Sequence, residues 1–214
     1  MRRLAIICCA LAGFAGCSQR GDLEQPAEPE QLWQQTQQVL QTYNQWDLQG
    51  RAVVRLPGAV YQIGLQWQRT PEQFLFLLEA PFGQGIIRME KVNPALYRLR
   101  LPGGQVYLDR SPEALLENAT GWSIPLQGLD YWIRGLPRPG PDYSYSVDAG
   151  GKTHTIDQDG WSVRYLDYSS SSELPALPRR LSLERDDVQM RLVIDRWQAE
   201  LIQDNKSEWF PEFH

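Results

Sequence analysis

The sequence predicts a mainly β fold of the α+β class, with an N-terminal helix and a helical insert. The expected architecture is an open, unclosed antiparallel barrel of about eleven strands, with the helices covering its mouth. Three observations support it. Apolar and polar residues alternate in many short runs, turn sequences separate these runs at intervals of about ten residues, and an apolar segment with helical spacing interrupts them midway. Curling the sheet under the helices is the simplest way to cover its apolar face.

The N-terminus has the pattern of a secretory signal. Two arginines give it a positive start, an apolar run extends over residues 4–14, and two small residues precede Cys17. The apolar run is shorter than the roughly 20 residues that a membrane-spanning helix needs. We therefore expect residues 1–16 to be a signal peptide that is removed.

Residues 14–17, Phe-Ala-Gly-Cys, resemble the lipobox of bacterial lipoproteins, in which the cysteine receives a diacylglyceryl group. The pattern prefers Leu where this chain has Phe14. The other two cysteines lie inside the signal, so the mature chain keeps only Cys17, which has no partner for an internal disulfide. Ser18 follows, where lipoproteins of the inner membrane commonly have Asp. The resemblance thus implies lipidation and an outer-membrane location with the domain facing the periplasm; the alternative is a secreted protein cut elsewhere.

After Cys17 the chain is polar to residue 30 and has two prolines, so residues 17–30 are expected to be a flexible tether with a reach of about 20 Å. Signal removal takes away two arginines and no acidic residue, which moves the net charge from −5 to about −7. This acidity argues against nucleic acid as a partner. The remaining residues suffice for one core, and we expect one domain over residues 31–197.

The first element is an amphipathic helix, since apolar residues recur at steps of three and four from Leu32 to Tyr43. The period then changes to two, first over residues 61–67 and later in three further runs, which predicts strands with one buried face. Six strands are expected before the break and five after it. The alternating runs are 61–67, 87–90, 97–101 and 188–194, and the turns are Pro57-Gly58, Thr70-Pro71, Asn93-Pro94, Pro102-Gly103-Gly104, Gly150-Gly151, Asp159-Gly160 and Asp186-Asp187.

The break, residues 111–136, is predicted to be helical. Ser111 and Pro112 form a plausible helix start, as N-cap and first-turn residue. A second, strongly apolar segment runs from Leu126 to Leu136, and Pro137 ends it. We expect these segments to form a lid over an apolar interior.

Three motifs resemble the LolB family of outer-membrane lipoprotein receptors, and the resemblance extends across residues 31–197. The tail, residues 198–214, has no counterpart and no role that we can assign. The motifs are Trp-Asp-Leu-Gln-Gly-Arg at 46–51, Ala-Pro-Phe-Gly at 80–83 and, most specific, Gly-Trp-Ser-Ile-Pro-Leu at 121–126 followed by Trp-Ile-Arg-Gly-Leu-Pro at 132–137.

The resemblance implies a monomeric receptor that accepts acylated lipoproteins from the periplasmic carrier LolA and inserts them into the outer membrane, without cofactor or nucleotide. Its partners would be a LolA-type carrier, the acyl chains of client lipoproteins, and outer-membrane lipid through Cys17. The physical need is clear, because each buried methylene is worth about 0.8 kcal/mol and a triacyl anchor does not cross water unaided at a useful rate. Transfer then follows the difference in binding free energy between carrier and receptor.

The acyl-binding cavity is expected inside the barrel, lined by apolar side chains of the strands and lid. For each candidate the alternative is ordinary core packing, because alternation identifies the apolar face and not a space beside it. The candidates are Ile63, Leu65, Trp67, Phe76, Ile87, Met89, Leu99, Leu101, Trp132 and Ile133.

Two further sites are expected. In the family a protruding apolar residue, commonly Leu, assists delivery into the membrane, and Phe82 of the Pro81-Phe82-Gly83 loop matches it. The alternative is a turn residue folded back on the barrel. Arg51 is a lesser candidate for a residue at the cavity mouth, where it would pair with carboxylates or other polar groups of the lid. The alternative is an ordinary surface arginine.

No enzymatic activity is expected. The mature chain has only His154 and the terminal His214, and no cluster with metal-ligand spacing. The alternative function is that of a structural or scaffolding outer-membrane lipoprotein that binds an envelope protein or a glycan at the open sheet edge. A glycan hydrolase is more remote, since it needs a carboxylate pair that the sequence does not reveal.

Overall fold

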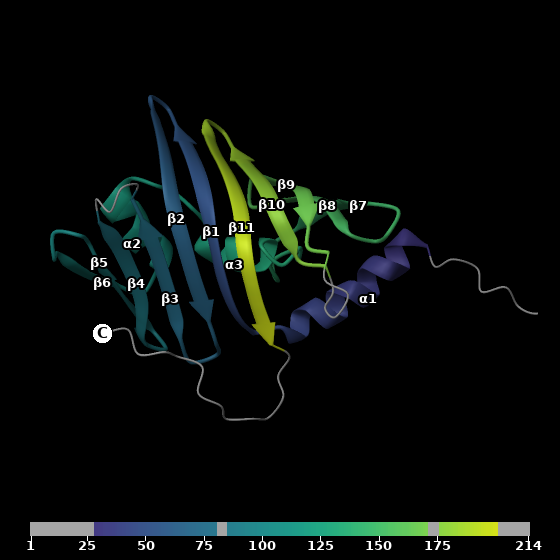
Figure 1. Cartoon of the computed structure of the whole chain (residues 1–214), viewed down its shortest axis with the longest axis horizontal. Helices are drawn as coiled ribbons and strands as arrows, with labels where there is room; N and C mark the ends of the chain where they lie inside the picture. Colours follow the sequence, from purple (N-terminus) through teal and green to yellow (C-terminus); the bar gives the residue numbers. More distant parts are fainter. Residues whose placement is uncertain (1–27, 81–84, 171–175, 201–214) are drawn as a thin grey trace, which may run out of the picture.

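The computed structural model describes residues 28–80, 85–170 and 176–200, and its centre is one eleven-stranded antiparallel sheet (Figure 1). The strands are ordered β6-β5-β4-β3-β2-β1-β11-β10-β9-β8-β7, so β6 and β7 are the two edges and the barrel stays open. The predicted order of helix, six strands, helical insert and five strands is confirmed, as is the open barrel. The elements are α1 Pro29–Thr42, β1 Gln45–Leu56, β2 Ala59–Arg69, β3 Phe74–Glu79, β4 Ile86–Asn93, β5 Leu96–Arg100, β6 Val106–Asp109, α2 Pro112–Thr120, α3 Leu126–Trp132, β7 Tyr143–Val147, β8 Thr153–Gln158, β9 Trp161–Tyr168, β10 Pro178–Arg185 and β11 Val188–Glu200.

The two longest strands, β1 and β11, pair at the centre of the sheet and join its two halves. Their register shifts between Gln49 and Gly50, which marks a β-bulge. A Cβ at Gly50 would collide with the carbonyl oxygen of Val193, so only glycine fits at this close approach. A bulge bends the strand and increases its twist, which helps the sheet to curl.

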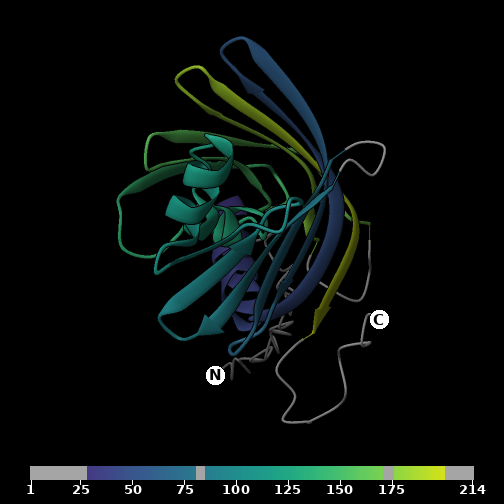
Figure 2. The ribbon, with the colours of Figure 1, turned by 90° about the vertical axis from the view of Figure 1, so that its left-hand side faces the viewer.

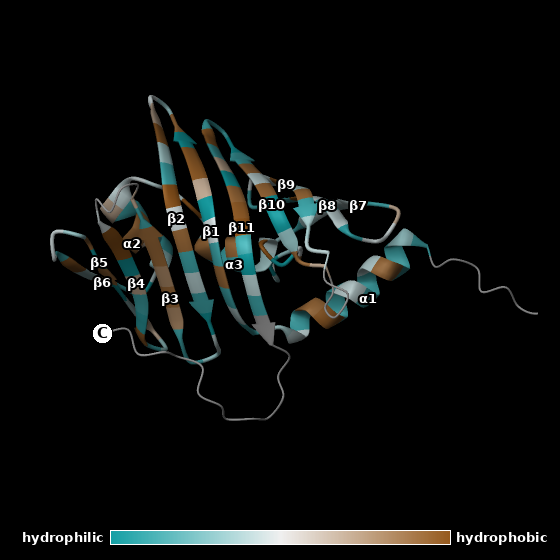
Figure 3. Ribbon diagram, viewed as in Figure 1, coloured by the Kyte–Doolittle hydropathy of each residue, from teal (hydrophilic) through white to brown (hydrophobic). Residues whose placement is uncertain are grey.

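The two faces of the sheet differ as the alternation predicts. Apolar residues recur at every second position over most of β1, β2 and β11, and Figure 3 shows this as alternating bands along these strands. The apolar residues face the concave side and form one large core cluster with those of α2 and α3. Figure 2 shows both helices inside the curl of the sheet. We call α2, α3 and their connection, residues 112–132, the lid.

The lid is fixed at its start and at its corner. Ser111 is the N-cap of α2, since its Oγ accepts a hydrogen bond of 3.1 Å from the amide of Ala114, as the sequence predicts. At the corner, the amide of Gln127 donates to Oε1 of Glu113 at 2.8 Å and links the start of α3 to α2. The second of these hydrogen bonds joins the two helices of the lid to each other, independently of their contacts with the sheet.

The N-terminal helix α1 packs beside the other end of the sheet. Trp33 stacks on Tyr145 of β7 with ring centroids 3.8 Å apart, and its Nε1 donates to Oγ1 of Thr153 at 3.0 Å. At the other end of α1, Leu40 is buried in a second, smaller apolar cluster with Leu136, just after the lid. None of the helices in the described part of the chain is long and apolar enough to cross a membrane.

Candidate functional site

A cavity of about 310 Å³ lies at the end of the barrel where β2 finishes and β3 begins, and we call it the end cavity. Its sheet wall is formed by side chains of β2, β3 and β5, and its other wall by the lid and the segment that follows. The residues at its surface are mostly apolar or aromatic, and two arginines, an aspartate and a glutamine stand among them. The cavity therefore combines apolar and polar groups in its lining, as small-molecule sites commonly do.

The sheet wall is a set of interlocked aromatic rings. Trp67 is fully buried and meets Phe74 edge-to-face with ring centroids 5.9 Å apart. Phe74 meets Tyr97 of β5 in the same manner at 5.5 Å. Edge-to-face pairs of this kind stabilise one arrangement of the rings beyond the effect of buried area. These three rings give the wall an apolar surface, which suits contact with hydrocarbon.

The lid wall carries a buried carboxylate, Asp130 of α3, which is only 8% exposed. Its Oδ2 accepts a hydrogen bond of 2.8 Å from Nε of Arg69, the last residue of β2. Its Oδ1 is buried and accepts no hydrogen bond from the described residues. Burial raises the pKa of Asp130 above its ordinary value, although the charges of Arg69 and Arg134 act in the opposite direction.

Arg134, just after α3, is the second buried charge of this region. Its Nε donates to the backbone carbonyl of Asp130 at 3.0 Å, and its Nη1 donates to the carbonyl of Tyr43 at 2.9 Å. Burial lowers the pKa of Arg134, and the charge of Asp130 opposes this shift. Arg134 thereby connects the end of the lid to the end of α1.

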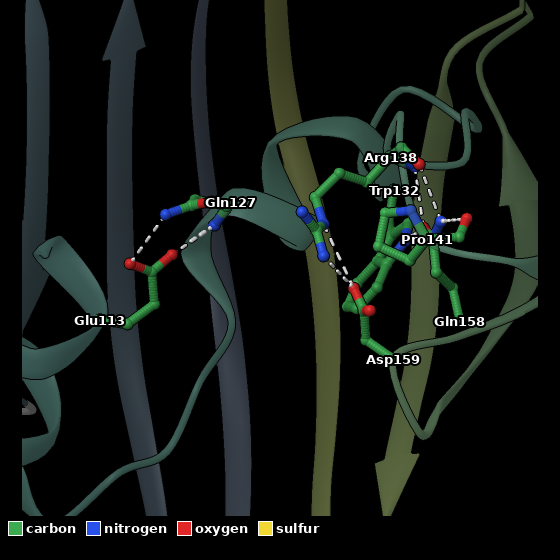
Figure 4. Close-up of polar contacts among 7 residues, drawn as sticks. All are labelled: Glu113, Gln127, Trp132, Arg138, Pro141, Gln158 and Asp159. Atoms are coloured by element: carbon green, nitrogen blue, oxygen red, sulfur yellow. Dashed lines mark hydrogen bonds and ion pairs between the residues drawn. The ribbon is translucent and has the colours of Figure 1, made fainter.

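Gln158 of β8 fixes the other side of α3 (Figure 4). Its Oε1 accepts hydrogen bonds from Nε1 of Trp132 at 3.0 Å and from the amide of Arg138 at 2.8 Å. Its Nε2 donates to the carbonyls of Arg138 at 2.8 Å and Pro141 at 3.3 Å. Arg138 also pairs with Asp159 at 2.8 Å. The buried side-chain amide of Gln158 thus attaches the lid and the segment after it to the sheet.

The ten residues predicted to line the acyl-binding cavity all belong to one apolar cluster on the concave side. Among them only Trp67 borders the end cavity. The others pack against one another and the lid within this cluster. Seven are buried, namely Leu65, Trp67, Phe76, Met89, Leu99, Trp132 and Ile133, and three are partly buried, namely Ile63, Ile87 and Leu101.

Arg51 is not brought together with these residues. It lies on the outer face of β1, and its Nη2 pairs with Oδ1 of Asp195 on β11 at 2.9 Å, with both side chains exposed. The loop Pro81-Phe82-Gly83 and Cys17 lie outside the described residues. Within the described ranges, no group of three His, Cys, Asp or Glu side chains is placed to hold a metal ion.

The sequence reasoning missed Arg69, Asp130 and Gln158, although two of them left a signal. Arg69 continues the series of every second residue that begins at Tyr61 and includes Leu65 and Trp67. It therefore lies on the same, inward face of the strand. Asp130 is a lone acidic residue in the apolar segment from Leu126 to Leu136, and a charge in such a segment indicates a partner. Gln158 left none, because its role depends on a segment that approaches it only in the folded chain.

Comparison with known proteins confirms the family resemblance that the sequence motifs indicate. A family model described as "Outer membrane lipoprotein LolB" matches residues 44–197. The chain belongs to the LolB family. A protein of Nitrosococcus oceani named outer-membrane lipoprotein LolB is 38% identical over 197 residues, which cover 92% of this chain and 97% of that protein. A protein of the same name from Alkalilimnicola ehrlichii is 33% identical, over 92% of this chain and 98% of its own length.

Among solved structures, the chain is similar to a LolA superfamily protein from Nitrosomonas europaea, with 8% identity and a TM-score of 0.49. That similarity covers 83% of this chain and 96% of that one. Membership of the LolB family confirms three expectations from the sequence. The chain is an outer-membrane lipoprotein receptor, it acts in lipoprotein handling, and it is not an enzyme.

Proposed function

We propose that this LolB-family receptor accepts the acyl chains of lipoproteins from a LolA-type periplasmic carrier and inserts the lipoproteins into the outer membrane, without cofactor or nucleotide. The main support is the concave face, whose side chains form one large apolar cluster and which is covered by a separate two-helix lid. Acyl chains on this face would be shielded from water, and the hydrophobic effect is large enough to hold them.

The proposal requires the lid to move. A volume of about 310 Å³ lies at the lower limit of sites for drug-sized ligands, roughly 300–1,000 Å³, and a triacyl anchor is longer and larger than such ligands. The lid buries Leu116, Leu126 and Trp132 against the sheet. If the lid moves outward, acyl chains replace these side chains on the same apolar surface. The exchange of one apolar contact for another keeps the free-energy difference between the closed and loaded states small.

We further propose the following assignment for the N-terminal segment. Residues 1–16 are a signal peptide, and Cys17 carries the lipid that anchors the chain in the outer membrane. The tether of this monomeric, periplasm-facing domain is shorter than the sequence predicts and ends at residue 28, because α1 begins at Pro29. The domain is then held within reach of the membrane surface and can meet the carrier there.

Phe82 is proposed to act in delivery, together with its neighbours Pro81 and Gly83. An aromatic residue at the tip of a loop partitions favourably into the interface of a bilayer. We expect Phe82 to contact the outer membrane while the acyl chains leave the barrel.

The test follows a lipoprotein from carrier to receptor to membrane. A labelled acylated lipoprotein bound to LolA is mixed with this protein in which Cys17 is replaced by Ala, and the location of the label is measured without nucleotide. Movement onto the receptor is expected. If the label stays on the carrier while circular dichroism shows a folded receptor, the acceptor function fails and the scaffold function replaces it.

Delivery is tested separately with liposomes and the lipidated receptor. The Phe82→Glu variant should accept the lipoprotein and fail to release it into the bilayer. The matched control is Leu166→Glu, which places the same charge at an exposed apolar position of β9 on the outer face. Equal delivery by both variants would remove Phe82 from the mechanism.

A further inference from the structure

We propose that Arg69 and Asp130 form a polar subsite of the end cavity that binds the N–H-bearing head of an acylated N-terminal cysteine. The receptor would therefore prefer lipoprotein anchors to lipids whose chains are joined only through esters. This inference rests on the proposed acceptor function and adds the chemical class of the ligand that the cavity selects.

The position of the pair suits an amphiphilic ligand. Arg69 ends β2 at the open end of the barrel and its side chain is 35% exposed, so the pair lies where the cavity meets solvent. Behind it, the wall continues into Trp67 and the fully buried Met89 and Leu99 of the core cluster. A ligand with its polar head at the pair would thus have its hydrocarbon directed along the concave face.

The two partners leave hydrogen-bonding capacity unused. A buried carboxylate oxygen without a partner is rare in folded proteins, and Oδ1 of Asp130 is in this state among the described residues. A guanidinium has five N–H donors, and within the described part of the chain Arg69 uses only Nε–H, toward Asp130. Both residues line the end cavity. Arg69 offers free donors there, whereas Oδ1 of Asp130 is covered and becomes accessible to a ligand only when the lid moves as proposed above.

An N-acyl amide complements this arrangement. Its N–H is a donor for Oδ1 of Asp130. In a trans amide the carbonyl points away from that N–H, so the guanidinium of Arg69 is left for a different carbonyl oxygen of the same anchor. The α-ammonium of a cysteine without the third acyl chain is also a donor for Asp130. An ester has acceptors only, so it would leave Oδ1 unpaired and place another oxygen near a carboxylate. The selection therefore depends on one N–H group beside the hydrocarbon.

Such a preference has a use for a protein tethered beside a membrane. Lipids of the surrounding bilayer carry the same hydrocarbon chains as a lipoprotein, and an apolar cavity alone distinguishes them poorly. A buried polar group that is satisfied by one ligand and left unpaired by the other gives strong discrimination. The receptor would then remain free of membrane lipid and available to its clients.

The experiment uses the full lipidated chain in nanodiscs, and empty nanodiscs supply the background. Four decanoyl or decyl probes are titrated by calorimetry. Three are built on cysteine methyl ester: an N–H amide, its N-methyl amide, and an S-alkyl cysteine with a free amine. The fourth is the O-acyl ester of the α-hydroxy analogue, in which oxygen replaces the α-nitrogen. We expect the N–H amide to bind about 10- to 100-fold more tightly than the N-methyl amide and the ester. A preference for the free amine over the ester would assign part of the selection to the α-amine.

The variant Arg69→Met/Asp130→Leu should bind the amide, N-methyl amide and ester probes alike, since it replaces the pair by apolar groups of similar size. The control Arg180→Met/Asp167→Asn removes an exposed ion pair from the outer face and should keep the preference. Should the first variant fail to fold, the wild-type comparison of N–H and N-methyl amides still decides. Equal affinities there would overturn the inference alone, whereas binding of no probe at all would overturn the acceptor function as well.

Discussion

Gln158 attaches the end of the lid to β8, and we expect Gln158→Leu to destabilise this attachment by about 3–5 kcal/mol. The side chain makes four hydrogen bonds, each with a net contribution of about 0.5–1.5 kcal/mol. Two of the groups it releases are donors, Nε1 of Trp132 and the amide of Arg138, and a buried donor without a partner costs about 1–3 kcal/mol. Trp132 is fully buried, so water does not replace the lost acceptor at its Nε1.

The assay is urea unfolding followed by tryptophan fluorescence, together with hydrogen exchange of the α3 amides. The free energy of unfolding should fall by the stated amount if the lid unfolds with the barrel. If the lid opens alone, the free energy of opening obtained from hydrogen exchange of the α3 amides should fall by a similar amount, while the urea unfolding transition stays unchanged. Gln62→Leu is the matched control, because Gln62 is exposed on the outer face and should change stability by less than about 0.5 kcal/mol. A Gln158→Leu effect below about 1 kcal/mol by both methods would refute the reasoning.

Three further predictions concern separate parts of the molecule. Gly151→Ala should cost about 2–4 kcal/mol in thermal unfolding, because Gly151 has φ +73° and an added Cβ would lie 2.5 Å from Cβ of Leu32 in α1; an unchanged melting temperature would contradict this contact. Burial raises the pKa of Asp130, so its folded form holds a proton above the unfolded pKa of about 3.9. That stabilising contribution is complete below the unfolded pKa and is lost as pH rises through the folded pKa, so Asp130→Asn should gain stability relative to the wild type between pH 4 and pH 7 in urea titrations. Arg51→Ala should change neither the melting temperature nor probe binding, since its ion pair is exposed; a loss of binding would return Arg51 to the acceptor site.

The strand pattern could be predicted because a sheet with one buried face must place every second residue inward. This rule located Leu65, Trp67 and Met89 on the concave side, and the turn sequences separated the strands correctly. The helical break at 111–136 was predictable for a similar reason, since the N-cap Ser111 and the apolar spacing are both local signals.

The way in which the two halves of the sheet come together could not be predicted in this way. It depends on the pairing of β1 with β11, which lie at opposite ends of the domain sequence. The place of α1 likewise depends on a hydrogen bond between Trp33 and Thr153, which are 120 residues apart. Alternation describes each strand separately, whereas these features arise from contacts between distant parts of the chain.

The sheet ends at β6 and β7, and these two edges are not joined in the described structure. In a closed barrel the number of strands and their stagger fix the diameter, so the circumference cannot grow without the loss of backbone hydrogen bonds. Here the edges can separate while every ladder between neighbouring strands stays intact. Under the acceptor function proposed above, the barrel widens for anchors with three chains and narrows for those with two, so that one receptor serves clients of different bulk.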